Sequence, residues 1–122
     1  MSLKRIIAST VMSLVIVAGL SAAKSDVADA VMKGDKAAVR ALLTQKADVN
    51  APQAEGATAL HWAVYRGDVE TANALISAGA NVKAATREGA TPLSLASTAG
   101  DGAMIAALIK AGADPIEPLP TG

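Results

Sequence analysis

The 122-residue sequence contains no cysteine and no phenylalanine, and its only histidine, tryptophan and tyrosine are His61, Trp62 and Tyr65. Without cysteine, the chain can form neither a disulfide nor a lipid-modified cysteine. With one histidine, it can build neither a catalytic triad of the usual kind nor a cluster of histidine metal ligands. Because aromatic side chains are scarce, the core has to be made from alanine, leucine, valine and isoleucine.

The sequence also has no excess of charge, since 11 basic residues balance 11 acidic ones. Proteins that bind nucleic acid or an anionic membrane surface usually carry a clear basic excess. We therefore expect no nucleic-acid partner.

The N-terminus has the pattern of a secretory signal peptide. Lys4 and Arg5 precede 18 uncharged residues, 6–23, which end in the small residues Ser21, Ala22 and Ala23. A basic start, an apolar centre and a small-residue exit predict that residues 1–23 are removed on export. In a bacterium with two membranes, the product would lie in the periplasm. An uncleaved membrane anchor is the alternative, because 18 uncharged residues approach the length that spans a bilayer.

Removal of residues 1–23 would leave 99 residues, with nine basic against 11 acidic side chains and a net charge of −2. The processed chain would then carry no membrane-spanning segment.

What the sequence does contain is internal repetition with a period of 33 residues. The run G-A-T-A-L-H-W-A-V-Y-R-G-D from Gly56 matches G-A-T-P-L-S-L-A-S-T-A-G-D from Gly89. A-L-I-S-A-G-A-N from Ala74 likewise matches A-L-I-K-A-G-A-D from Ala107. A diverged copy precedes both, with its Gly-Asp pair at residues 34–35. Such a period predicts a solenoid, whose units bury their apolar faces against their neighbours.

Within one period, the residue pattern predicts two short helices joined by a tight turn. Thr58 and Asp68 stand where helix N-caps are expected, and Gly67 and Gly79 stand where helices end. Apolar residues fall at helical spacing in both segments; they are Leu60, Ala63, Val64, Val69, Ala72, Leu75 and Ile76. Residues 80–88 have no helical pattern and predict an extended loop. Gly102, in the first turn of a predicted helix, should weaken the last unit.

These motifs resemble those of the ankyrin repeat family. The resemblance rests on Gly56-x-Thr58-x-Leu60-His61-x-Ala63, on Gly67-Asp68, and on Leu75-Ile76-x-x-Gly79-Ala80-Asn81-Val82. It implies an all-α ankyrin-repeat solenoid of helix-turn-helix units with extended hairpin loops over residues 24–122. The repeats would cover about 24–55, 56–88 and 89–121, and a fourth would begin at residue 122. Alternatively, the chain ends naturally in the proline-rich segment 115–120.

The resemblance also implies where a partner would bind. In this family, residues before the turn glycine lie on the concave face and residues at the loop tips contact partners. The positions that match are Tyr65 and Arg66 before the turn, and Ala54, Glu55, Ala57, Arg87, Glu88 and Ala90 at the tips. Trp62 has two interpretations, as a core side chain between units or as a further contact residue.

No set of residues predicts catalysis. The resemblance gives His61 a structural role, with hydrogen bonds between neighbouring units. Two acidic pairs, Asp26 with Asp29 and Asp68 with Glu70, suit helix caps and exposed helix faces better than acid–base chemistry, which needs a buried pocket. The sequence therefore predicts an exported protein-interaction module without enzymatic activity, cofactor or metal. The alternative is a scaffold or regulatory arm of a larger envelope protein or enzyme that continues beyond residue 122.

Overall fold

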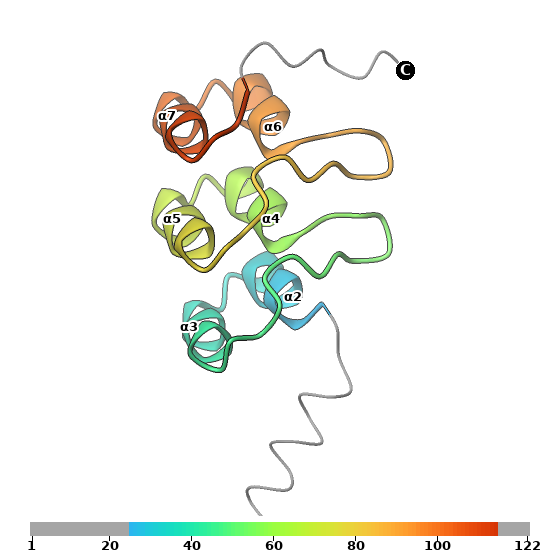
Figure 1. The fold of residues 1–122 in the computed structure, drawn as a ribbon, viewed down its shortest axis with the longest axis vertical. Helices are drawn as coiled ribbons and strands as arrows, with labels where there is room; N and C mark the ends of the chain where they lie inside the picture. Colours follow the sequence, from blue (N-terminus) through green and yellow to red (C-terminus); the bar gives the residue numbers. More distant parts are fainter. Residues whose placement is uncertain (1–24, 115–122) are drawn as a thin grey trace, which may run out of the picture.

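The structure is a computed structural model that describes residues 25–114. This part of the chain forms six α-helices and no strand, arranged as three pairs of antiparallel helices (Figure 1). The pairs are α2 (Asp26–Lys33) with α3 (Lys36–Thr44), α4 (Ala59–Tyr65) with α5 (Val69–Ser77), and α6 (Pro92–Ala99) with α7 (Gly102–Lys110). The prediction of an all-α ankyrin-type solenoid is confirmed. The proposed signal peptide, the proline-rich segment and the start of a fourth repeat lie outside the described residues.

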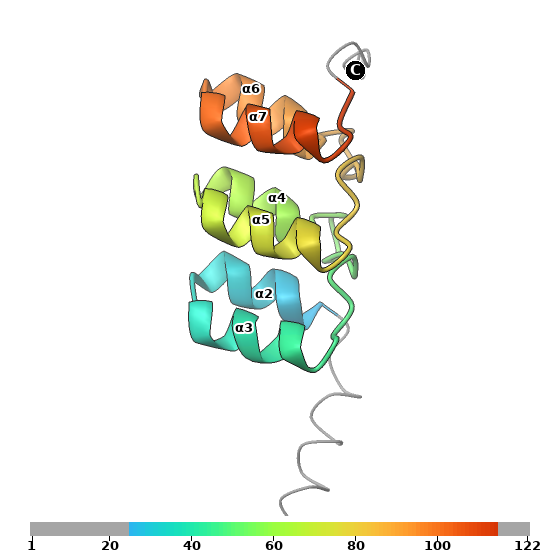
Figure 2. The same ribbon diagram turned by 60° about the vertical axis from the view of Figure 1, so that its left-hand side comes forward.

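The three helix pairs stack one above the other in two layers (Figure 2). The first helices of each pair form one layer, in which α4 packs against both α2 and α6. The second helices form the other layer, in which α7 packs against α5. The loops that join one pair to the next extend to the same side of the stack, away from α3, α5 and α7 (Figure 1).

The core consists of small and aliphatic side chains, as the scarcity of aromatic residues requires. Leu60, Leu75, Met104 and Leu108 are completely buried. Alanines occupy equivalent positions in the three first helices, and all three are buried: Ala30, Ala63 and Ala96. A methyl side chain at this position lets the helices of successive pairs approach closely, so that the layer is continuous. No helix within residues 25–114 is long and apolar enough to cross a membrane.

The tight turn between paired helices has the same construction in each repeat. An aspartate is the N-cap residue of α3, α5 and α7, and its carboxylate accepts a hydrogen bond from the backbone N–H three residues later. These bonds are 3.0 to 3.1 Å long and run to Asp35, Asp68 and Asp101. They satisfy backbone donors that have no partner within the helix, as predicted for Asp68.

The two long loops are hairpins, each closed by a backbone hydrogen bond. Gln53 N–H donates to the Ala57 carbonyl in the first loop, and Thr86 N–H donates to the Ala90 carbonyl in the second, both at 2.9 Å. The loops also bind each other, because Arg87 N–H donates to the Glu55 carbonyl at 2.9 Å. These bonds hold the second hairpin beside the first, so their tips form one surface.

Candidate partner-binding groove

A surface groove of about 360 Å³ lies where the second hairpin meets the helices α4 and α6. Its walls come from four elements, which belong to two successive repeats and their hairpins. The lining residues are Ala57 of the first hairpin, His61, Trp62 and Tyr65 of α4, Thr86, Glu88 and Ala90 of the second hairpin, and Leu95 of α6. The groove therefore exists only where two repeats and their loops are stacked.

The two aromatic residues of the chain form one wall of this groove. The ring centroids of Trp62 and Tyr65 are 5.6 Å apart, and the rings stand at 86° to each other. Such edge-to-face pairs are favourable beyond the area they bury. Trp62 is half-buried and packs against the core, whereas Tyr65 is 76% exposed. Trp62 thus packs against the core, as the first interpretation expects, and it also lines the groove; its contact with a partner stays a prediction.

A chain of hydrogen bonds fixes the Trp62 ring. Its Nε1–H donates to Gln53 Oε1 at 2.8 Å, and Gln53 Nε2 donates to Asp29 Oδ1 at 2.7 Å. The bond to the Asp29 carboxylate is charge-assisted and hence stronger than a bond between neutral groups. The chain joins α2, the first hairpin and α4. It also gives Asp29 a structural role, in place of the exposed-helix or capping role expected from the sequence.

His61 lines the groove and links two repeats. Its Nδ1 accepts the backbone N–H of Thr58 at 3.0 Å and lies 2.9 Å from the Thr58 hydroxyl oxygen. The proton is therefore on Nε2, which donates to the Ala90 carbonyl of the next hairpin at 2.9 Å. The predicted structural role of this histidine between neighbouring units is confirmed.

The surroundings of His61 favour its neutral form. The side chain is only 3% exposed, and this burial lowers the pKa of His61 below its ordinary value of 6.5. Hydrogen bonds with the carbonyls of Ala90 and Ala84 act in the opposite direction but do not outweigh burial. A neutral ring that accepts from one repeat and donates to the next has no nitrogen left for acid–base work.

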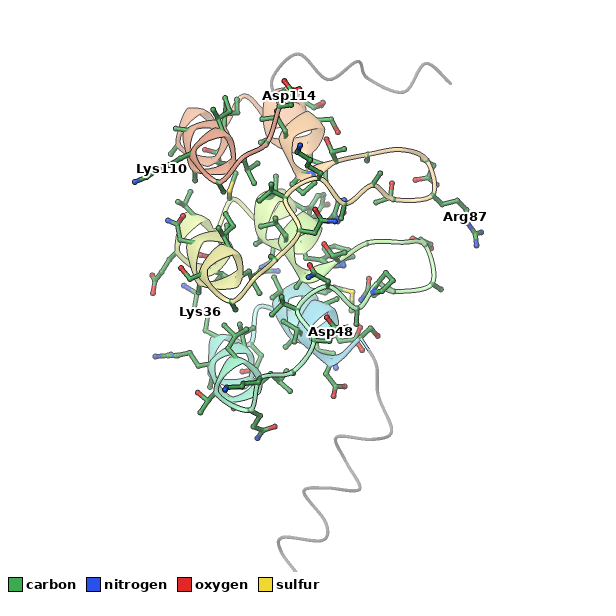
Figure 3. All side chains as sticks on the ribbon, in the orientation of Figure 1. Lys36, Asp48, Arg87, Lys110 and Asp114 are labelled. Carbon is green, nitrogen blue, oxygen red and sulfur yellow. The ribbon has the colours of Figure 1, made fainter. Side chains whose placement is uncertain are left out.

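The structure brings half of the predicted contact residues together at this groove. Four of the eight line it: Tyr65, Ala57, Glu88 and Ala90. Ala54 and Glu55 are exposed at the tip of the first hairpin. Arg87 is exposed at the tip of the second, and its side chain extends away from the helices (Figure 3).

Arg66 has contacts that the sequence did not reveal. Its Nη1 donates to the Met32 carbonyl near the end of α2 at 3.3 Å. A Cβ placed on Gly34 would lie 2.6 Å from Arg66 Nη2, so the guanidinium lies directly against the preceding turn. Arg66 is therefore a contact between repeats, although its exposed surface remains open to a partner.

Asp68 caps helix α5. Burial alone would raise the pKa of Asp68, but hydrogen bonds from the Thr71 hydroxyl and backbone N–H outweigh it and lower the pKa. Lys36, whose Nζ lies 3.9 Å from Asp68 Oδ2, and Arg66 act in the same direction. Within the described residues, no three histidine, aspartate or glutamate side chains are grouped as metal ligands would be.

Sequence reasoning missed Gln53, the residue that orients Trp62, and did not assign Thr86 and Leu95 to the surface. A signal for Gln53 was present, because it stands 33 residues before Thr86 and both begin a hairpin. Gln53 Oε1 accepts the indole N–H, whereas Thr86 Oγ1 accepts the Ala90 N–H within its own hairpin.

The stacked helix pairs, capped turns and projecting hairpins define a repeat solenoid, and a comparison with family models agrees with this architecture. A model for ankyrin repeats in three copies matches residues 27–117. The chain therefore belongs to the ankyrin repeat family, whose members are generally protein–protein interaction modules. No curated protein matches the chain.

Proposed function

We propose that this chain binds a partner protein through the groove and the adjacent hairpin tips. The observation that carries the proposal is Tyr65, which is 76% exposed although it is one of only two aromatic residues in the chain. Tyrosine is enriched among the residues that contribute most to binding energy at interfaces. A partner would cover this ring.

The rigidity of the surroundings supports the same proposal. The Tyr65 ring rests on Trp62, which the bonds to Gln53 hold in place. The hairpin opposite is fixed to its neighbour by the bond between Arg87 and Glu55. A surface that is ordered before binding loses little conformational entropy when a partner docks.

A pull-down with the full chain as bait tests this function. Tyr65→Ala removes the exposed ring without opening the core, and we expect it to abolish capture of a partner. Thr98→Ala is the matched control, because Thr98 is the equivalent exposed residue of the next repeat and lies outside the groove lining. Equal capture by the Tyr65→Ala and unchanged baits would reject this groove as the binding surface.

We also propose that the protein is exported and that residues 1–23 are its signal peptide. The basic start, the uncharged stretch and the Ser21-Ala22-Ala23 exit support this proposal. Intact mass spectrometry of the protein from its native host should give a chain that begins at Lys24. A mass that includes residues 1–23 would instead favour the uncleaved anchor.

A further inference from the structure

We propose that the groove receives a cationic side chain, lysine or arginine, from an exposed peptide segment of the partner. This inference rests on the proposed binding function and adds the chemistry of the group that is recognised. Three features of the groove support it: the charge of its lining, the aromatic wall and the apolar part of its lining.

The first feature is charge. Glu88 is the only charged residue among those that line the groove, and it is an exposed residue. Neither nearby arginine lines the groove: Arg87 extends away from the helices (Figure 3), and the Arg66 guanidinium lies against the turn of the preceding repeat. A groove with one acid and no lining base is complementary to a cation.

The second feature is the aromatic wall. A cation close to the face of a tryptophan or tyrosine ring is attracted by the negative potential of that face. The rings of Trp62 and Tyr65 are nearly perpendicular, so a guest group in the corner between them can approach both. The Trp62 N–H is already bonded to Gln53, so the indole requires no hydrogen-bond acceptor from the guest.

The third feature is the apolar part of the lining, which Ala57, Ala90 and Leu95 supply. Lysine and arginine carry three or four methylene groups that bury readily along apolar surface while the charged end reaches a polar one. A purely aliphatic guest would leave the Glu88 carboxylate partly desolvated and without a partner, which costs free energy. A cationic side chain can pack its methylene groups against the apolar lining and place its charge beside the Glu88 carboxylate.

A selection of tryptophan-free random peptides on the full chain tests this inference. Trp62 is the only tryptophan in the sequence, so its fluorescence reports occupation of the groove directly. We expect selected peptides to be enriched in lysine or arginine and to change the Trp62 emission. Each peptide is then compared with a copy in which norleucine replaces the lysine, or citrulline the arginine. The neutral copy should bind about fivefold or more weakly, the size expected from one partly exposed ion pair and one cation–π contact.

Two variants of the protein locate the interaction. Glu88→Gln should weaken binding of the cationic peptide about two- to fivefold and leave that of its neutral copy unchanged. Glu55→Gln is the control, because Glu55 holds the equivalent position of the first hairpin and does not line the groove. We expect Glu55→Gln to bind as the unchanged protein does, and the Glu88 effect to shrink at high salt.

The outcomes separate this inference from the proposed function. Peptides that bind with no preference for a cation, or that respond equally to both glutamate variants, would overturn the inference and leave a protein-binding groove. Selection of no peptide would also overturn it. The proposed function is judged independently, by whether Tyr65→Ala loses the partner in the pull-down.

Discussion

A single position of the repeat carries three different chemistries in this protein. Asp29, Trp62 and Leu95 are separated by 33 residues and occupy equivalent places on α2, α4 and α6. The aspartate anchors a hydrogen-bond chain, the tryptophan forms a wall of the groove, and the leucine lines that same groove. The repeat determines where a side chain lies in the stack, and the residue type determines which contacts it makes at that position.

Two glycines of the last repeat should respond oppositely to the same substitution. Gly102 begins α7 with no left-handed backbone angle, and a Cβ there would meet nothing within 4 Å. Gly102→Ala should therefore stabilise the fold by about 0.4–1 kcal/mol. Gly100 is left-handed, with φ 68°, so Gly100→Ala should destabilise it by about 1–2 kcal/mol. Urea unfolding of both variants measures the difference, and shifts of the same sign would contradict it.

The pKa of His61 predicts that stability depends on pH. The ordinary pKa of 6.5 applies to the unfolded chain, and the pKa in the folded state is lower. Below pH 6.5 the unfolded chain therefore binds a proton that the folded protein does not accept. The stability that the neutral His61 side chain contributes is complete above pH 6.5. It declines as the pH falls towards the pKa of His61 in the folded state.

Urea unfolding at pH 7.5 and pH 5.0 checks this expectation. The unchanged protein should be less stable at pH 5.0, and His61→Gln, which cannot titrate, should lose this difference. Asp68 does not contribute to a difference in stability between pH 7.5 and pH 5.0. Because the pKa of its carboxyl is lowered from the ordinary value of 3.8, its effect on stability changes with pH only below that value. An equal loss of stability at pH 5.0 in His61→Gln would place the sensitivity at another group.

At the scale of helices and loops, the first hairpin is attached to two helices through one side chain. Gln53 bonds both Asp29 of α2 and Trp62 of α4. Gln53→Leu keeps a similar size but leaves the indole N–H and the carboxylate without this partner. We expect a loss of about 1 kcal/mol in the free energy of unfolding and a change in the Trp62 emission.

The control for this prediction is Gln45→Leu, at the exposed end of α3. A substitution at an exposed site away from such a network should change the stability by less than about 0.5 kcal/mol. Equal effects of the two substitutions would mean that the hydrogen-bond chain contributes nothing to the fold.

The helices and their caps were predictable from the sequence, whereas several contacts between repeats were not. Thr58, Asp68 and Gly67 act within a few residues of their own helix, so local pattern and capping rules were sufficient. Arg66 and Gln53 reach partners 34 and 24 residues away. Whether a long side chain turns towards a neighbouring repeat or towards solvent depends on the stacking geometry, which the repeat pattern does not specify.

At the scale of the whole molecule, the two junctions between helix pairs are unequal. Arg66, Gln53 and Asn50 all form side-chain hydrogen bonds across the first junction. Gln53 accepts the Trp62 indole N–H, and Asn50 bonds the Gly79 carbonyl at 3.0 Å and the Asn81 N–H at 2.7 Å. Across the second junction, His61 bonds the Ala90 carbonyl. Ala99 and Thr86 take the places of Arg66 and Gln53 there. An alanine side chain forms no hydrogen bond, and Thr86 Oγ1 accepts the Ala90 N–H within its own hairpin.

This inequality predicts the order in which the solenoid opens. Repeat units are stabilised by their own contacts and by those with nearest neighbours. We therefore expect α6 and α7 to open before α2 to α5, with lower amide protection in native-state hydrogen exchange. Earlier exchange in α2 and α3 would show that apolar packing, and not these hydrogen bonds, sets the order.

The residues that differ at equivalent positions of the repeats also determine how many guest segments one chain should bind. One repeat before the groove, the places of Trp62, Tyr65 and Glu88 are taken by Asp29, Met32 and Glu55. That junction has the acid but neither aromatic ring, so residues 25–114 cannot form a second copy of the same groove. A solenoid is a tandem structure, yet residues 25–114 of this one contain a single groove of this composition. The complex with its partner should therefore contain one guest segment per chain, however regular the stack that presents it.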